Sequence, residues 1–120
     1  MKQRNWETLD PHLIYDEMSE AADRYAETQY IADLAEKAAE KAFDDAFLAL
    51  RDEPGSIDRK KSQARASKSH QDALDAFLKA KREALRCKLA WQALTTKLEF
   101  VRTLETSLRA QAQHIDRSRG

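Results

Sequence analysis

The chain has few of the residues that interrupt or cross-link a fold. Its 120 residues include 2 glycines, 2 prolines and 1 cysteine. The single cysteine, Cys87, excludes a disulfide within the chain and is typical of a reducing compartment, so we expect a cytoplasmic location. With so little glycine and proline, the main break in a helical chain is the Pro54-Gly55 pair near its middle.

Long apolar runs are also missing. No run of 18 apolar residues occurs, so the sequence predicts no membrane-spanning helix and no membrane partner. The first 20 residues mix acidic side chains such as Asp16 and Glu17 with apolar ones, and we expect no signal peptide. Leu, Ile, Val and Phe total 22 of the 120 residues, which predicts a thin core. A thin core on a small chain favours oligomerisation.

Alanine and charged residues make up much of the composition instead. The chain has 20 alanines, and with Leu, Glu, Lys, Arg and Gln they are the strongest helix formers. The formal net charge is zero, but Met1–Asp58 carries a net −9 and Arg59–Gly120 a net +9. An acidic half therefore precedes a basic half, and two helices of opposite charge attract each other when they fold back together.

Apolar residues recur every seven positions in both halves. In the first half the series is Met18, Tyr25, Ala32, Ala39 and Ala46, complemented by Ala21 or Ala22, Ala35, Ala42 and Ala49, with a polar lapse at Thr28 and Gln29. In the second half the two series are Ala73, Ala80, Cys87, Leu94, Val101, Leu108 and Ile115, and Phe77, Ala84, Trp91 and Leu98. Such seams are typical of coiled-coil-like pairs. Further apolar residues widen the predicted stripes: Ile31, Leu34, Phe43, Phe47, Leu50, Leu74, Leu78, Leu85 and Leu89.

Cap residues divide the chain into one domain, 1–120, with five segments. A leader spans 1–10, and an acidic helix spans 11–52, with Asp10 as N-cap and Pro11 at the first helical position. A basic connector spans 53–69, in which Ser56 caps a short helix. A basic helix spans 70–113, capped by Ser69, and a tail spans 114–120. The predicted fold is all-α: a long antiparallel helical hairpin with a short connecting helix, forming an oligomer.

The sequence predicts no catalytic centre, cofactor or metal site. The three histidines, His12, His70 and His114, lie far apart without the partners of a ligand set, and we expect them to face solvent. Cys87 lies on the seam and is expected to be a buried small apolar residue. No Ser/His/Asp arrangement and no glycine-rich phosphate loop occurs. We therefore expect a protein that is not an enzyme.

A run of cations is the strongest functional signal. The connector carries five cations with no acidic residue between them, and the last helix continues the cluster, so the predicted nucleic-acid-binding residues are Arg59, Lys60, Lys61, Arg65, Lys68, Lys81, Arg82, Arg86 and Lys88. A cationic strip of this kind neutralises phosphates. The alternative is that these cations pair with the acidic helix inside the hairpin or face water.

The combination of a long acidic helix, a Pro-Gly turn, a Gly55–Lys60 connector and a heptad ending over Lys97–Arg109 resembles a family of small phage and prophage proteins. These proteins are encoded near recombination genes, including single-strand annealing genes. The resemblance covers Tyr15–Arg109, with Phe100 and Thr103 departing from the residues usual in the family ending. It implies a phage setting, the cytoplasm of a bacterial host and a role in recombination, and it supplies no catalytic residues.

These observations leave three functions open. The first is a non-enzymatic accessory protein of phage recombination or replication that binds single- or double-stranded DNA or a recombinase. The second is an inhibitor of a host defence or nuclease complex, in which the acidic face imitates phosphates; exposure of Glu20, Glu27, Asp44 and Asp45 favours it. The third is a purely structural coiled-coil protein that assembles with copies of itself.

Overall fold

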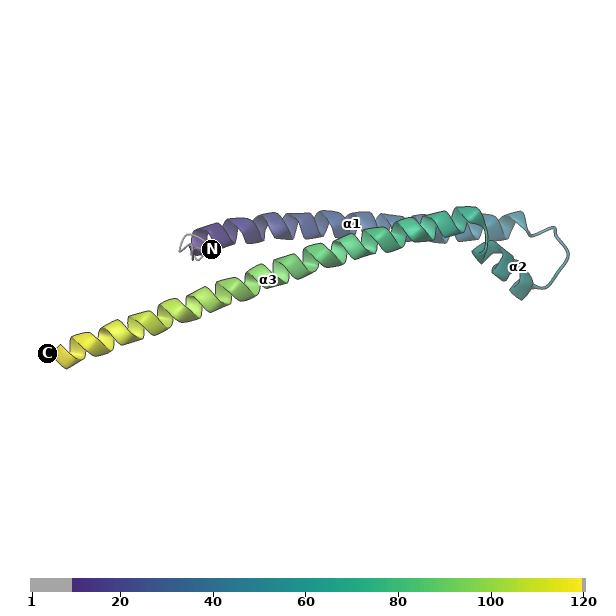
Figure 1. The fold of residues 1–120 in the computed structure, drawn as a ribbon. Helices are drawn as coiled ribbons and strands as arrows, with labels where there is room; N and C mark the ends of the chain where they lie inside the picture. The colour runs from purple at the N-terminus through teal and green to yellow at the C-terminus, as the bar shows by residue number, and fades with distance from the viewer. Residues whose placement is uncertain (1–9, 120) are drawn as a thin grey trace, which may run out of the picture. The chain divides into compact units, whose positions relative to one another are not determined.

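The computed structural model describes residues 10–119, and these form three helices and no strand. Helix α1 spans Pro11–Ala49, α2 spans Ile57–Arg65 and α3 spans Lys68–Arg119. Figure 1 shows α2 at the connection between the end of α1 and the start of α3. The leader predicted over 1–10 lies outside the described residues except for Asp10.

The chain divides into two compact units. One unit combines Met1–Asp23 with Lys88–Gly120, and the other is Arg24–Cys87. Each unit pairs a stretch of α1 with a stretch of α3, and the earlier stretch of α1 belongs with the later stretch of α3. The predicted all-α antiparallel hairpin with a short connecting helix is therefore confirmed.

Two of the three predicted N-caps, Asp10 and Ser56, are confirmed. Asp10 Oδ1 accepts a hydrogen bond from the backbone N–H of His12 over 3.0 Å, and Ser56 Oγ accepts one from Arg59 N–H over 3.2 Å. The predicted cap Ser69 is wrong, because α3 begins two residues earlier. There Ser67 Oγ accepts from the N–H of His70 over 3.3 Å, which satisfies a backbone donor of the first turn.

The helix ends differ from the predicted ones. Helix α1 ends at Ala49 instead of residue 52, and a turn follows. In this turn Gly55 has a φ of +133°, a backbone conformation that residues other than glycine rarely adopt. Helix α3 continues to Arg119 instead of ending at residue 113, so 114–119 is helical rather than a tail. No glycine or proline lies between Gly55 and Gly120 to stop it.

The core of the first unit is small. Ile14 of α1, which is 1% exposed, packs with Leu98 and Val101 of α3, and Met18 lies against them. The side chain of Arg102 donates to the hydroxyl of Tyr15, and its guanidinium carbon lies 5.3 Å from the centre of that ring.

The core of the Arg24–Cys87 unit consists mainly of alanine. Ala32 and Ala39 of α1, Ala64 of α2, and Ala84 and Cys87 of α3 are buried. The predicted seam is therefore confirmed at Ala32, Ala39, Ala84 and Cys87, whereas Ala49, also predicted on it, is exposed at the end of α1. Small seam residues allow two helix backbones to approach closely, at the cost of burying little apolar area.

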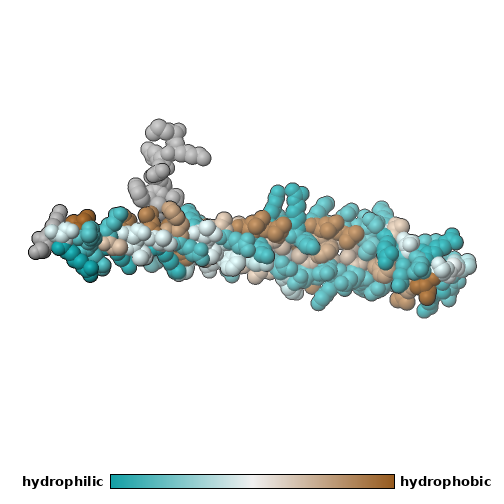
Figure 2. Space-filling view, turned by 90° about the horizontal axis from the view of Figure 1, so that it is seen from below, coloured by the Kyte–Doolittle hydropathy of each residue, from teal (hydrophilic) through white to brown (hydrophobic). Residues whose placement is uncertain are grey.

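Many of the larger apolar residues lie at the surface instead, as the brown areas of Figure 2 illustrate. The predicted widening residues Ile31 and Leu34 are 47% and 49% exposed, because a helix can bury only one face against a single partner. Leu108 and Ile115, predicted on the seam, are 56% and 51% exposed. Helix α1 starts at Pro11, so its described residues supply no partner for these positions.

Candidate functional site

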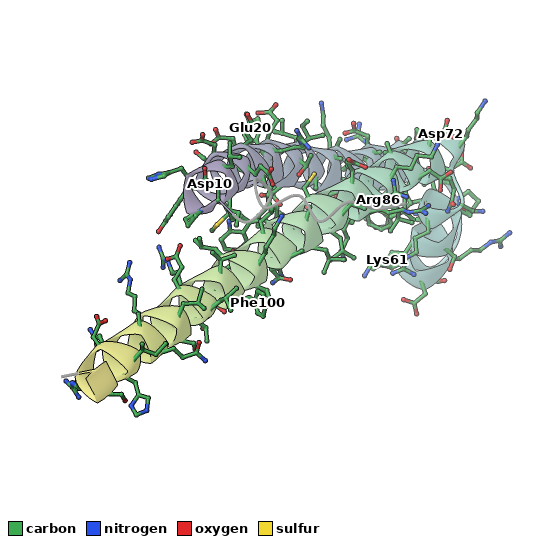
Figure 3. The ribbon with its side chains drawn as sticks, turned by 60° about the vertical axis from the view of Figure 1, so that its left-hand side comes forward. Asp10, Glu20, Lys61, Asp72, Arg86 and Phe100 are labelled. Carbon is green, nitrogen blue, oxygen red and sulfur yellow. The ribbon has the colours of Figure 1, made fainter. Side chains whose placement is uncertain are left out.

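The basic residues of α2 reach solvent, with one exception. Arg59 and Lys61 are exposed, and Figure 3 shows Lys61 extending from the helix. Lys60 is half-buried, and its Nζ donates a hydrogen bond to the carbonyl oxygen of Arg51 over 3.2 Å. Lys60 therefore stabilises the turn after α1, because it donates to the backbone carbonyl of a residue of that turn.

The next two cations lie where α2 joins α3. Lys68 is the first residue of α3 and is exposed. Arg65 is exposed as well, but its guanidinium carbon lies 5.9 Å from the centre of the Phe43 ring. This cation–π contact holds Arg65 against α1. Of the five cations of the connector, Arg59, Lys61 and Lys68 are then the ones without a described partner.

The cations predicted on α3 are all exposed. Lys81 Nζ lies 5.9 Å from the centre of the Phe77 ring. Arg82 and Arg86 belong to the same unit, and Figure 3 shows Arg86 projecting from the side of α3. Lys88 belongs to the other unit.

Charge pairing is almost absent among the described side chains of the two long helices. Among the described side chains the single ion pair joins Arg51 to its neighbour Asp52, with 3.7 Å between Arg51 Nε and Asp52 Oδ2, and both side chains are largely exposed. The net −9 and +9 of the two halves are therefore not neutralised by contacts between α1 and α3 in the described part of the chain. Pairing within the hairpin, one of the two alternatives to DNA contact, is therefore not found among the described residues, and the predicted cations other than Lys60 are exposed.

The acidic residues of α1 show the same behaviour. Glu20, shown on α1 in Figure 3, is exposed, as are Glu27, Asp44 and Asp45. None of them forms an ion pair in the described residues. The protein therefore presents an acidic surface on α1 and a basic surface on α2 and α3, and both are available to partners.

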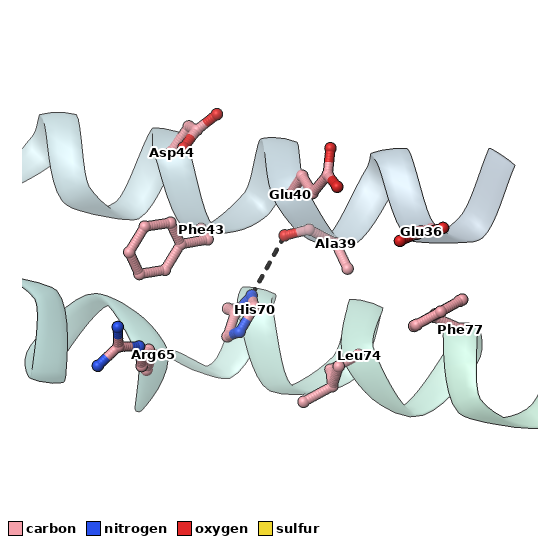
Figure 4. Close-up of a pocket in the computed structure, with 9 residues that line it drawn as sticks. All are labelled: Glu36, Ala39, Glu40, Phe43, Asp44, Arg65, His70, Leu74 and Phe77. Carbon is pink, nitrogen blue, oxygen red and sulfur yellow. Dashed lines mark hydrogen bonds between the residues drawn. The ribbon is translucent and has the colours of Figure 1, made fainter. Parts of the chain in front are cut away.

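A groove lies between α1 and the start of α3 within the Arg24–Cys87 unit. Its volume is about 550 Å³, and its walls are apolar and aromatic, with Phe43 on α1 and Leu74 and Phe77 on α3. Three carboxylates of α1 line it as well: Glu36, Glu40 and Asp44. In Figure 4 the carboxylates of Glu40 and Asp44 point away from α3, so they form the rim of the groove.

The structure tests the prediction that the three histidines face solvent. His12 and His114 are exposed as predicted, but His70 is half-buried, so the expectation that it faces solvent is wrong. Its ring lies edge-on to Phe43, with 5.6 Å between the ring centres. Among residues 10–119, no three His, Cys, Asp or Glu side chains gather in a way that holds a metal ion.

Sequence reasoning missed the groove. Its signal is nonetheless present, because Glu36, Glu40 and Phe43 follow one another at helical spacing, each one position after a seam residue. The partner stripe on α3 begins at Leu74. Only the pairing of the two helices shows that both stripes lie on the same side.

No helix in the described part of the chain is long and apolar enough to cross a lipid bilayer. Comparison with known proteins gives no match for this chain to a protein-family model, a curated protein or a solved structure.

Proposed function

We propose that this protein is a non-enzymatic accessory protein of phage DNA recombination or replication, acting in the bacterial cytoplasm by binding DNA. The observation that supports this proposal best is the exposure of Arg59, Lys61 and Lys68, which have no acidic partner among the described residues. A cation that already has an acidic partner gains little binding free energy from a phosphate. An unpaired cation neutralises the phosphate and releases the counterions condensed on the DNA, which favours binding.

The surface that binds DNA in this proposal is centred on α2. Two contacts hold α2 in place: Ala64 is buried, at 1% exposed, and Lys60 donates a hydrogen bond to the turn after α1. Arg59 and Lys61 therefore project from a helix whose position is fixed. Arg86, which is exposed on α3, adds a cation to the same unit. Contacts of this kind go to the phosphate backbone, so we expect little sequence preference.

The test is binding of purified protein to single- and double-stranded DNA over a range of salt concentrations. The variant Arg59→Glu, Lys61→Glu, Lys68→Glu should bind far more weakly, and the slope of log affinity against log salt should become shallower by about 0.7 to 0.9 for each phosphate that is no longer neutralised. The matched control is Arg24→Glu, Lys37→Glu, Lys41→Glu on α1, which changes net charge equally. Equal binding by both variants would contradict the proposed surface.

A second function is favoured by a different observation. Glu20, Glu27, Asp44 and Asp45 are exposed and form no described ion pair, so α1 offers carboxylates to a basic protein channel that normally holds nucleic acid. In this case the protein inhibits a host defence or nuclease complex. The test is inhibition of such a complex by the wild-type chain and by the variant Asp44→Lys, Asp45→Lys. Loss of inhibition in the variant, together with no detectable DNA binding by the free wild-type protein, would favour this function over the first.

A further inference from the structure

We propose that the groove between α1 and α3 binds a second copy of this chain, and that the segment seated in it is the stretch of α3 that directly follows the groove. This interaction goes beyond DNA binding and does not depend on it. Every residue that carries the inference lies within Arg24–Cys87.

The groove has the properties of a protein-docking site. Phe43, Leu74 and Phe77 give it apolar walls. The carboxylates of Glu36, Glu40 and Asp44 line its α1 side and outnumber its one lysine or arginine, Arg65, which lies beside Phe43. A complementary segment therefore needs apolar side chains in its centre and cations at its edge. Interfaces commonly combine these two features, an apolar core and a polar rim.

The next two turns of α3 have this composition. Leu78 and Leu85 are each 53% exposed, and Lys81 and Arg82 stand between them. Leu74, Leu78, Lys81 and Leu85 follow at spacings of four, three and four residues, which places them on one face of the helix. The exposed leucine strip is thus continuous with the α3 wall of the groove.

The groove is apolar and acidic, and the strip beside it on the same face is apolar and basic. The face is therefore complementary to a second copy of itself. A two-fold axis between them brings the strip of each copy over the groove of the other, as an isologous dimer requires. Lys81 and Arg82 of one copy then meet Glu36 and Glu40 of its partner. This arrangement pairs charges of the acidic and basic halves between two copies, whereas no ion pair joins α1 to α3 among the described residues of one copy.

Charge reversal provides the test, with the mass in solution as the readout and no DNA present. The wild-type chain should sediment at twice its 13.8 kDa mass. Glu36→Lys, Glu40→Lys and, separately, Lys81→Glu, Arg82→Glu should each weaken the dimer at least about tenfold, because like charges then face each other. The control Lys37→Glu, Lys41→Glu, also on α1, should leave it unchanged.

Mixing the two reversed variants makes the test decisive. In the mixture each strip again meets a groove of opposite charge, so a one-to-one heterodimer should form from two chains that are separately monomeric. Helicity of each variant, measured by circular dichroism, shows that folding is intact. A monomeric wild type, or a dimer that reversal does not weaken, overturns the proposal, as does a mixture that stays monomeric.

Discussion

The imidazole of His70, near the start of α3, donates a hydrogen bond from Nδ1 to the carbonyl oxygen of Ala39 on α1 over 3.2 Å (Figure 4). The carbonyl can only accept, so Nδ1 carries the proton. The same ring packs edge-on against Phe43. One half-buried side chain thus joins the two long helices next to the connection.

Replacement of His70 separates its two contributions. His70→Phe keeps an aromatic ring beside Phe43 but removes the hydrogen bond, and should lower the free energy of unfolding by about 1 kcal/mol. His70→Ala removes the ring packing as well and should be more destabilising than the Phe variant. Urea unfolding followed by circular dichroism measures both values. Equal stability of wild type and His70→Phe would show that the hydrogen bond contributes nothing.

The start of α3 allows a comparison of two nearby serines. Ser67→Ala removes the acceptor for the N–H of His70 and should cost about 1 kcal/mol. Ser69→Ala lies inside the first turn, has an exposed side chain and should change stability by less than about 0.5 kcal/mol. Thermal unfolding of the two variants tests the assignment, and a larger loss of stability for Ser69→Ala would return the cap to that residue.

The narrow seam predicts intolerance to larger side chains. Ala39 is 5% exposed, so Ala39→Leu forces the helices apart and should cost about 1–3 kcal/mol. The neighbouring Ala38 is exposed, and Ala38→Leu should stay within about 0.5 kcal/mol of wild type. Unfolding in guanidinium chloride at a fixed protein concentration gives both values. If the two variants are equally stable, Ala39 is not at a close approach of the helices.

The first unit offers the opposite change, from large to small. Ile14 is 1% exposed and packs against Leu98 and Val101, so Ile14→Ala should cost about 2–5 kcal/mol if the first unit unfolds with the rest. Leu13, its neighbour, is 46% exposed, and Leu13→Ala serves as the control with a loss of stability below about 0.5 kcal/mol. Hydrogen exchange of amides in the first unit detects the same destabilisation locally if the two units unfold separately.

Much of the fold was predictable because it depends on local chemistry. The Pro54-Gly55 break and the Ser56 cap act within a few residues of their own position, and the alanine seam repeats regularly enough to be found by spacing. The choice between Ser67 and Ser69 was not predictable in this way. Both are competent caps, and the turn after α2 decides between them.

The functional surfaces were only partly predictable. The exposure of Arg59 and Lys61 follows from their place on a short polar helix. The role of Lys60 at the end of α1 required the turn geometry, because Arg51 precedes it by nine residues. Among the described residues the two halves carry opposite charges without pairing, because net charge does not specify how each helix is rotated about its axis. Most of their charged side chains are exposed.

The connection near His70 also has a kinetic consequence. The Ala39–His70 contact closes a loop of 31 residues, whereas the Tyr15–Arg102 contact spans 87. Forming the longer contact first costs about 0.9 kcal/mol more chain entropy. We therefore expect the helices to pair first next to the connection and later at their far ends. Substitutions at His70 should slow folding, while substitutions at Ile14 should mainly speed unfolding.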